Sequence, residues 1–106
     1  MRTLEIYRNG VLAGQLIEEN PNQFSFRYDL RYLRNEKNPA ISLTLPKTEE
    51  KFKSTLLFPF FFNMLSEGVN RKLQSLYLRI DENDHLGLLA ATAQTDTIGA
   101  ITVKQI

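Results

Sequence analysis

Apolar and polar residues alternate along the first half of the chain, in the pattern of half-buried strands. In "TLEIYRNGVLAGQLI" the dipeptide Asn-Gly at positions 9 and 10 favours a two-residue type I′ turn, which predicts a β-hairpin. The predicted register pairs residues across this turn, Tyr7 with Leu12 and Ile6 with Ala13. One face of the hairpin then carries Leu4, Ile6, Val11 and Ala13. The opposite face carries Tyr7, Leu12 and Leu16.

Two further stretches show the same alternation. "FSFRY" places three aromatic residues on one side of a strand, namely Phe24, Phe26 and Tyr28. "NPAISLTLP" places three aliphatic residues on one side of another strand, namely Ile41, Leu43 and Leu45. Between the two, Asp29 is expected to cap a short helix that runs through Arg34. The charged run "KTEEKFKS" is predicted to be a solvated loop.

The second half begins with "LLFPFFFNMLSEG", residues 56–68, which is apolar on almost every side. Pro59 suits the first turn of a helix, and Gly68 suits the left-handed position just past a helix end. We therefore predict a helix from about Phe58 to Ser66. Its apolar arc would cover roughly 240°, against about 100° for an ordinary surface helix. Such a helix is either buried nearly all round or has one side that binds a partner.

The residues that follow keep the helical period. One face of a predicted helix contains Val69, Leu73, Leu76, Tyr77 and Ile80. The next helix has capping candidates at Asp81, Asn83 and Asp84. Its apolar residues are Leu86, Leu89, Ala90 and Ala93. The final stretch, "IGAITV", is predicted to be a strand with Ile101 and Val103 facing inward. This order of elements predicts an α+β fold, a small, mostly antiparallel β-sheet with three to four short helices packed on it.

Composition adds limits. A chain of 106 residues is expected to form a single domain, residues 1–106, that buries about two-thirds of its unfolded surface. The net charge of +1 does not predict direct binding to nucleic acid. The absence of cysteine excludes disulfides, thiolate metal sites and cysteine catalysis. The N-terminus has no signal-peptide core, so a cytoplasmic location away from the membrane is expected.

Candidate catalytic groups are sparse. His85 is the only histidine, so a serine hydrolase would depend on it, together with Ser66 and Glu67. Asp81 and its acidic neighbours lack the spacing of an EF-hand and are better explained by the start of a helix. No glycine-rich phosphate loop is present. We therefore expect a binding module without catalytic, cofactor or metal-binding residues, and keep the small hydrolase as the alternative.

Three stretches together resemble the N-terminal domain of HipA-type serine/threonine kinases. They are "YRNGVLAGQL", "FSFRYDLRYL" with "PAISLTLP", and "LFPFFFNMLSEG" with "LLAATAQTDTIGAITV". The resemblance extends from Leu4 to Val103. Ser66 stands where the family usually has proline, and Gln94 where a glycine often precedes the aspartate. Both departures concern loop geometry.

The resemblance implies a role in binding. In HipA proteins the catalytic groups lie in a larger C-terminal domain, so no kinase residue can be transferred to this chain. A free-standing domain of this kind is similar to the HipS component of HipBST toxin–antitoxin systems, which binds the kinase HipT. The resemblance thus implies an antitoxin-type subunit that inhibits a HipA-like kinase, with a HipB-like DNA-binding protein joining directly or through that kinase. The alternative is the structural and assembly domain of a full-length HipA kinase.

The apolar stretch at 56–68 is the predicted contact region. Helical spacing places Phe58, Phe62 and Leu65 on the side that packs on the sheet. It places Phe60, Met64 and Glu67 on the side that faces the kinase, with Phe61 between the two. The residues predicted to bind the partner are Phe60, Phe61, Met64, Leu65, Ser66 and Glu67.

Overall fold

The computed structural model describes residues 1–65, 68–92 and 101–106. Within them, five strands form one antiparallel sheet in the order β4-β3-β2-β1-β5. The strands are β1 (Arg2–Arg8), β2 (Val11–Asn20), β3 (Gln23–Tyr28), β4 (Lys51–Ser54) and β5 (Ile101–Gln105). The helices are α1 (Leu30–Arg34), α2 (Pro59–Phe62), α3 (Gly68–Leu78) and α4 (His85–Thr92). The predicted α+β class is confirmed.

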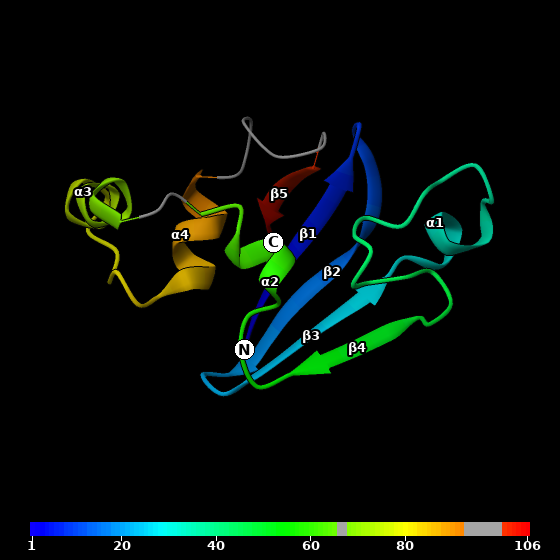
Figure 1. Ribbon diagram of the computed structural model, residues 1–106, viewed down its shortest axis with the longest axis horizontal. Helices are drawn as coiled ribbons and strands as arrows, with labels where there is room; N and C mark the ends of the chain where they lie inside the picture. Colours follow the sequence, from blue (N-terminus) through cyan, green and yellow to red (C-terminus); the bar gives the residue numbers. More distant parts are fainter. Residues whose placement is uncertain (66–67, 93–100) are drawn as a thin grey trace.

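The core lies between one face of the sheet and the helices α2 and α4. Figure 1 shows α3 beyond α4 at one end of the molecule, with α1 at the opposite end. The sheet contributes Leu4, Ile6, Leu16, Phe26, Ile101 and Val103 to this core. The helices contribute Phe61, Leu86, Leu88, Leu89 and Ala90. The inward direction predicted for Ile101 and Val103 is confirmed, whereas Ala93 lies outside the described residues.

The first hairpin has the predicted turn but contains a β-bulge. Asn9 and Gly10 have φ angles of 51° and 79°, as a type I′ turn requires. Tyr7 pairs with Leu12, as predicted. The predicted pairing of Ile6 with Ala13 is wrong, because the bulge makes Gly14 the partner of Ile6, and so Leu16 pairs with Leu4 on the core face.

A glycine is needed at position 14. A Cβ atom there would lie 2.3 Å from the carbonyl oxygen of Arg27 and 2.9 Å from the ring of Phe26. The bulged residue, Ala13, is buried, and its carbonyl accepts a 2.8 Å hydrogen bond from the N–H of Asp29. Asp29 in turn caps α1 by accepting the N–H of Arg31, so the predicted cap is confirmed. The bulge therefore fixes where α1 begins.

The strand predicted over "NPAISLTLP" is wrong. Ile41 and Leu45 are buried, but Leu43 is 99% exposed at the tip of a tight turn in which Leu45 donates its N–H to the carbonyl of Ser42. The hydroxyl of Tyr28 accepts the N–H of Ile41 at 3.1 Å and donates to the carbonyl of Leu45. A tyrosine therefore satisfies the buried backbone groups that a neighbouring strand would otherwise pair.

A second tyrosine holds the start of the same loop. The hydroxyl of Tyr32 donates to the carbonyl of Pro39 at 2.5 Å. Its ring stacks on that of Tyr28, with ring centroids 5.9 Å apart and planes 7° from parallel. Lys47 lies over the Tyr32 ring at 5.6 Å and donates to two backbone carbonyls of the loop. The loop is thus ordered without regular secondary structure.

Part of the predicted polar loop "KTEEKFKS" is the edge strand β4. Phe52 pairs with Phe26 of β3 and packs edge-on against Tyr28, with ring centroids 6.4 Å apart. Lys51 and Lys53 alternate with Phe52 and are exposed. A single apolar residue was too weak a signal to predict this strand, and the flanking lysines are typical of a protected sheet edge.

The apolar helix is shorter than predicted. Pro59 begins α2, as predicted, but the helix ends at Phe62 and continues only as two tighter turns, in which Met64 and Leu65 donate to carbonyls three residues earlier. Gly68 has the predicted positive φ angle, 54°, but it begins α3 instead of following the end of α2. Phe58 has an extended backbone, with ψ of 138°, so the helical wheel does not describe its direction.

The two later helices form where they were predicted, but α3 ends at Leu78. Ile80, predicted on its apolar face, therefore lies beyond the helix and packs against the core. Asp84 caps α4 by accepting the N–H of Gly87 at 3.1 Å. Asp81 instead stabilises the preceding turn by accepting the N–H of Asn83 at 2.8 Å. The capping prediction is therefore confirmed for Asp84.

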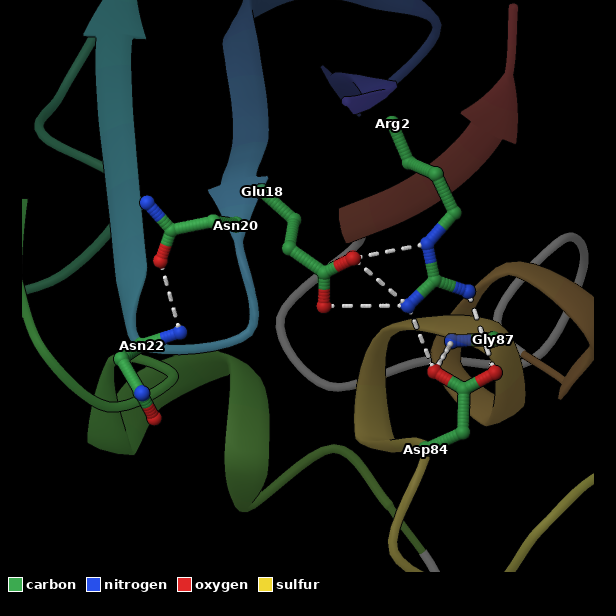
Figure 2. Close-up of polar contacts among 6 residues, drawn as sticks. All are labelled: Arg2, Glu18, Asn20, Asn22, Asp84 and Gly87. Atoms are coloured by element: carbon green, nitrogen blue, oxygen red, sulfur yellow. Dashed lines mark hydrogen bonds and ion pairs between the residues drawn. The ribbon is translucent and has the colours of Figure 1, made fainter.

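Arg2, at the start of β1, joins the sheet to α4 (Figure 2). Its guanidinium donates to Glu18 on β2, from Nε to Oε1 at 2.9 Å and from Nη2 to Oε2 at 3.0 Å. It also donates to Asp84, from Nη1 to Oδ2 at 3.0 Å and from Nη2 to Oδ1 at 2.7 Å. The hydrogen bonds from Arg2 are the largest cause of a lowered pKa of Asp84; burial opposes them, and the N–H of Gly87 adds to the lowering.

Replacing Arg2 by methionine should lower the free energy of unfolding by about 1 kcal/mol at pH 7. Because the pKa of Asp84 is lower in the folded state, its ion pair stabilises the fold above the ordinary value of 3.8. That contribution is lost as the pH falls through the folded-state pKa. Urea unfolding should therefore show the difference between native chain and variant shrinking from about pH 5 towards about pH 1.

Arg27→Met is the matched control for this prediction. Arg27 makes one exposed contact, 3.7 Å from Glu50, so its replacement should change stability by less than about 0.5 kcal/mol. An Arg2→Met effect of equal size at neutral and acid pH would contradict the role assigned to Asp84.

Replacing Tyr28 by phenylalanine should cost about 1–3 kcal/mol, because the buried N–H of Ile41 and carbonyl of Leu45 lose their partner. Thermal unfolding measures the effect. Tyr77→Phe provides the control, since Tyr77 is 87% exposed and its hydroxyl should contribute almost nothing. A melting temperature for Tyr28→Phe equal to that of the control would show that the loop does not depend on this hydroxyl.

Candidate partner-binding surface

Two of the residues predicted to bind a partner lie in the core. Phe61 is fully buried, and Leu65 is 5% exposed. The ring of Phe61 lies 5.7 Å from that of Phe26 on β3 and 5.2 Å from that of Phe60. Phe61 is thus the residue through which α2 packs on the sheet.

The other predicted contact residues lie nearer the surface or outside the described residues. Phe60 and Met64 are half-buried and pack against the edge of the core. Ser66 and Glu67 lie outside the described residues. Of the predicted contact residues that the structure describes, only Phe60 and Met64 therefore keep part of their side chains accessible to a partner.

Phe62 was assigned to the sheet side from the sequence, yet it is 37% exposed. Its ring packs edge-on against the ring of His85, with centroids 5.0 Å apart. The guanidinium of Arg71 lies over the Phe62 ring, 5.3 Å from its centroid. Phe62 thus connects α2 to both α3 and α4 at the surface.

A shallow groove follows this part of the surface. Its volume is about 330 Å³, and its lining residues are Leu56, Leu57, Pro59, Phe62, Asn63 and His85. Leu56 is 75% exposed at its edge, so the groove is mostly apolar and open to solvent. The imidazole ring of His85 lines one side of this groove next to Phe62.

The helix α3 turns its apolar side to solvent. We define the α3 apolar face as Val69, Leu73, Leu76 and Tyr77. These side chains are 71%, 59%, 70% and 87% exposed, respectively. No residue of α3 is buried. The periodicity that predicted this helix is correct, but its apolar face points away from the core.

Polar residues occupy the opposite side of α3, towards the rest of the domain. Arg71 and Ser75 are half-buried there, and Arg71 lies against Phe62. Ser75 anchors the end of the helix, because its hydroxyl donates to the carbonyl of Ile80 and its own carbonyl accepts the N–H of Ile80 at 3.1 Å. The orientation of α3 is therefore fixed by polar and cation–π contacts.

This orientation leaves hydrophobic free energy unused. Fully burying a leucine or valine side chain stabilises a structure by about 1.5–3 kcal/mol relative to exposure. Four adjacent apolar side chains on one helix face form a contiguous patch, in contrast to the single exposed apolar residues found on any protein. A partner that covers the α3 apolar face would gain this free energy.

The structure gives no support to the hydrolase alternative. His85 packs on Phe62, while Ser66 and Glu67 lie outside the described residues. In the described part of the chain no three His, Cys, Asp or Glu residues are grouped so that they could hold a metal ion. None of the described helices has the length and apolar character needed to cross a membrane.

Comparisons with known proteins match this architecture. A chain solved as the N-terminal domain of HipA toxin superposes with a TM-score of 0.73 at 26% identity, covering 100% of this chain and 93% of that one. An uncharacterised protein of Haemophilus influenzae is 28% identical over 105 residues, 99% of this chain and 93% of that protein. A Sinorhizobium fredii protein named as a kinase, Y4mE, is 27% identical over 89 residues, 84% of this chain but 21% of its own length.

The family model described as the HipA N-terminal domain matches residues 4–104, nearly the whole sequence. The match contains all the described strands except the ends of β1 and β5, and it includes α1, α2, α3 and α4. The structural likeness extends over the same range. The chain therefore belongs to the HipA N-terminal domain family.

Proposed function

We propose that this chain is an antitoxin-type regulatory subunit that binds a separately encoded HipA-like serine/threonine kinase in the cytoplasm and restrains its activity. The observation that carries the proposal is the outward α3 apolar face, which gives a member of this family a surface suited to a protein partner. Binding, and not catalysis, is the contribution of the chain.

The relatives support two arrangements of the domain. It covers 93% of the Haemophilus influenzae relative and 21% of the Sinorhizobium fredii protein named as a kinase. The first favours a separate subunit that acts on a kinase in trans. The second favours the alternative, a structural and assembly domain within a longer kinase. Both arrangements require a surface that contacts a kinase.

Around α2 we propose that Phe60 and Met64, two of the predicted contact residues, contact the kinase. We add Phe62 to them. These three side chains keep part of their surface accessible, while Phe58 and Phe61 of the same segment are buried in the core. The contribution of Ser66 and Glu67 stays a prediction. A HipB-like DNA-binding protein would join through the kinase, because a net charge of +1 gives the chain little attraction to DNA.

The test is to mix the purified chain with a HipA-like kinase lacking this domain and to measure affinity and kinase autophosphorylation. We expect a stoichiometric complex with autophosphorylation reduced at least about tenfold. Met64→Ala should weaken binding by about 2 kcal/mol, roughly thirtyfold in Kd, if Met64 is an anchor at the interface. Leu30→Ala is the control, because Leu30 is 43% exposed on α1 at the far end of the molecule (Figure 1).

Melting temperatures separate the two possible roles of Met64. A large drop in melting temperature with unchanged affinity would place Met64 in the core alone and remove it from the contact surface. Absence of any complex with the unchanged chain would contradict the proposed function itself.

A further inference from the structure

We propose that α3 is the docking element of the partner-binding surface. It enters an apolar groove on the kinase, and one rim of that groove carries carboxylates. This inference rests on the proposed function and specifies the chemistry of the partner. The outward face of α3 and the charges along its two borders support it.

The α3 apolar face is long and regular enough to act as a docking helix. Val69 and Tyr77 are eight residues apart, so the face extends about 12 Å along the helix axis at 1.5 Å per residue. Val69, Leu73 and Leu76 fall at i, i+4 and i+7, which is the spacing used when an amphipathic helix occupies an apolar groove. The helix is already formed and anchored by Arg71 and Ser75, so binding does not have to order it.

The two borders of this face differ in charge. Lys72 lies along one border and is exposed. Arg79 comes directly after α3, with a positive φ angle of 57°, and adds a second exposed cation at the C-terminal end of the helix. Asn70 and Gln74, four residues apart, lie along the other border and are neutral. Residues 68–78 contain no Asp or Glu. Among the described residues, no ion pair joins Lys72 or Arg79 to a carboxylate.

This asymmetry determines the charge of the partner. A groove that receives the apolar face brings one rim beside Lys72 and Arg79 and the other beside uncharged amides. Carboxylates on the first rim would pair with the two cations, steer association and fix the direction of the helix in the groove. The acidic residues Asp81 and Glu82 follow the helix in sequence, and among the described residues no ion pair joins either of them to Lys72 or Arg79.

A second copy of the chain is a less suitable occupant. Two α3 helices packed antiparallel through their apolar faces would place both basic borders on the same side, so Lys72 and Arg79 would meet like charges. A helix face of four side chains is also small beside the roughly 800 Å² per partner of a stable interface. A larger groove with an acidic rim meets both requirements.

The experiment compares two variants with the same change in net charge. Lys72→Gln with Arg79→Gln removes two positive charges from the basic border, whereas Asn70→Asp with Gln74→Glu adds two negative charges to the neutral border. Binding to the HipA-like kinase is measured by surface plasmon resonance at several salt concentrations. We expect the first variant to associate about tenfold more slowly at low salt and to lose most of its salt dependence, and the second to change less than threefold.

Leu73→Asp tests the apolar face itself. We expect at least a hundredfold loss of affinity with an unchanged melting temperature, because Leu73 is 59% exposed and contributes little to the fold. Normal binding by this variant would overturn the inference while leaving the proposed function intact. If Leu73→Asp abolishes binding but the two charge variants show the same association rate and salt dependence, the proposed carboxylates on the rim of the groove would be contradicted.

Sedimentation of the chain alone tests whether a second copy of the chain covers the α3 apolar face. A dimer that Leu73→Asp dissociates, with kinase binding unaffected, would assign the face to self-association and overturn the inference. A monomer that binds the kinase through α3 supports it. No binding by the unchanged chain would overturn the inference and the proposed function together.

Discussion

In the described part of the chain, α2 and α4 pack together on one face of a five-stranded sheet and cover its core residues. Phe61 packs against the ring of Phe26, and Leu88 and Leu89 are fully buried beside the same face. A chain of this size buries only about two-thirds of its unfolded surface. The helix α3 packs against α4 and contributes no buried residue to this core. Its apolar face is therefore left outside the core that the sheet, α2 and α4 form.

Local signals in the sequence were sufficient for much of this architecture. The Asn9-Gly10 turn and the caps at Asp29 and Asp84 each depend on residues that are neighbours in the chain, and each is confirmed. Helical periodicity likewise placed α3 and α4, and alternation placed the inward residues of β3 and β5. These signals determined the order and type of most elements and hence the fold class.

Features that depend on distant residues could not be predicted in this way. The bulge that turns Leu16 to the core arises from the pairing of two strands, and Leu43 is exposed because Tyr28 holds the backbone on either side of it. For the candidate surface, the sequence identified an apolar face on α3 but not its direction. That direction depends on contacts between separate elements, such as that of Arg71 with Phe62, and on a sheet face that is already occupied.

Folding and the proposed binding depend on different residues in this domain. Arg2, Tyr28 and Phe61 hold the sheet, the long loop and α2 together, whereas the apolar residues of α3 contribute almost no burial to the fold. Substitutions on the α3 apolar face should therefore alter partner choice with little effect on stability, which fits a structural relative that shares the fold at 26% identity. The free energy that folding leaves unused on α3 is about 1.5–3 kcal/mol for each large side chain a partner fully buries. Because the helix is already ordered, binding does not have to order its backbone, and only the translational, rotational and side-chain costs of association are set against that free energy.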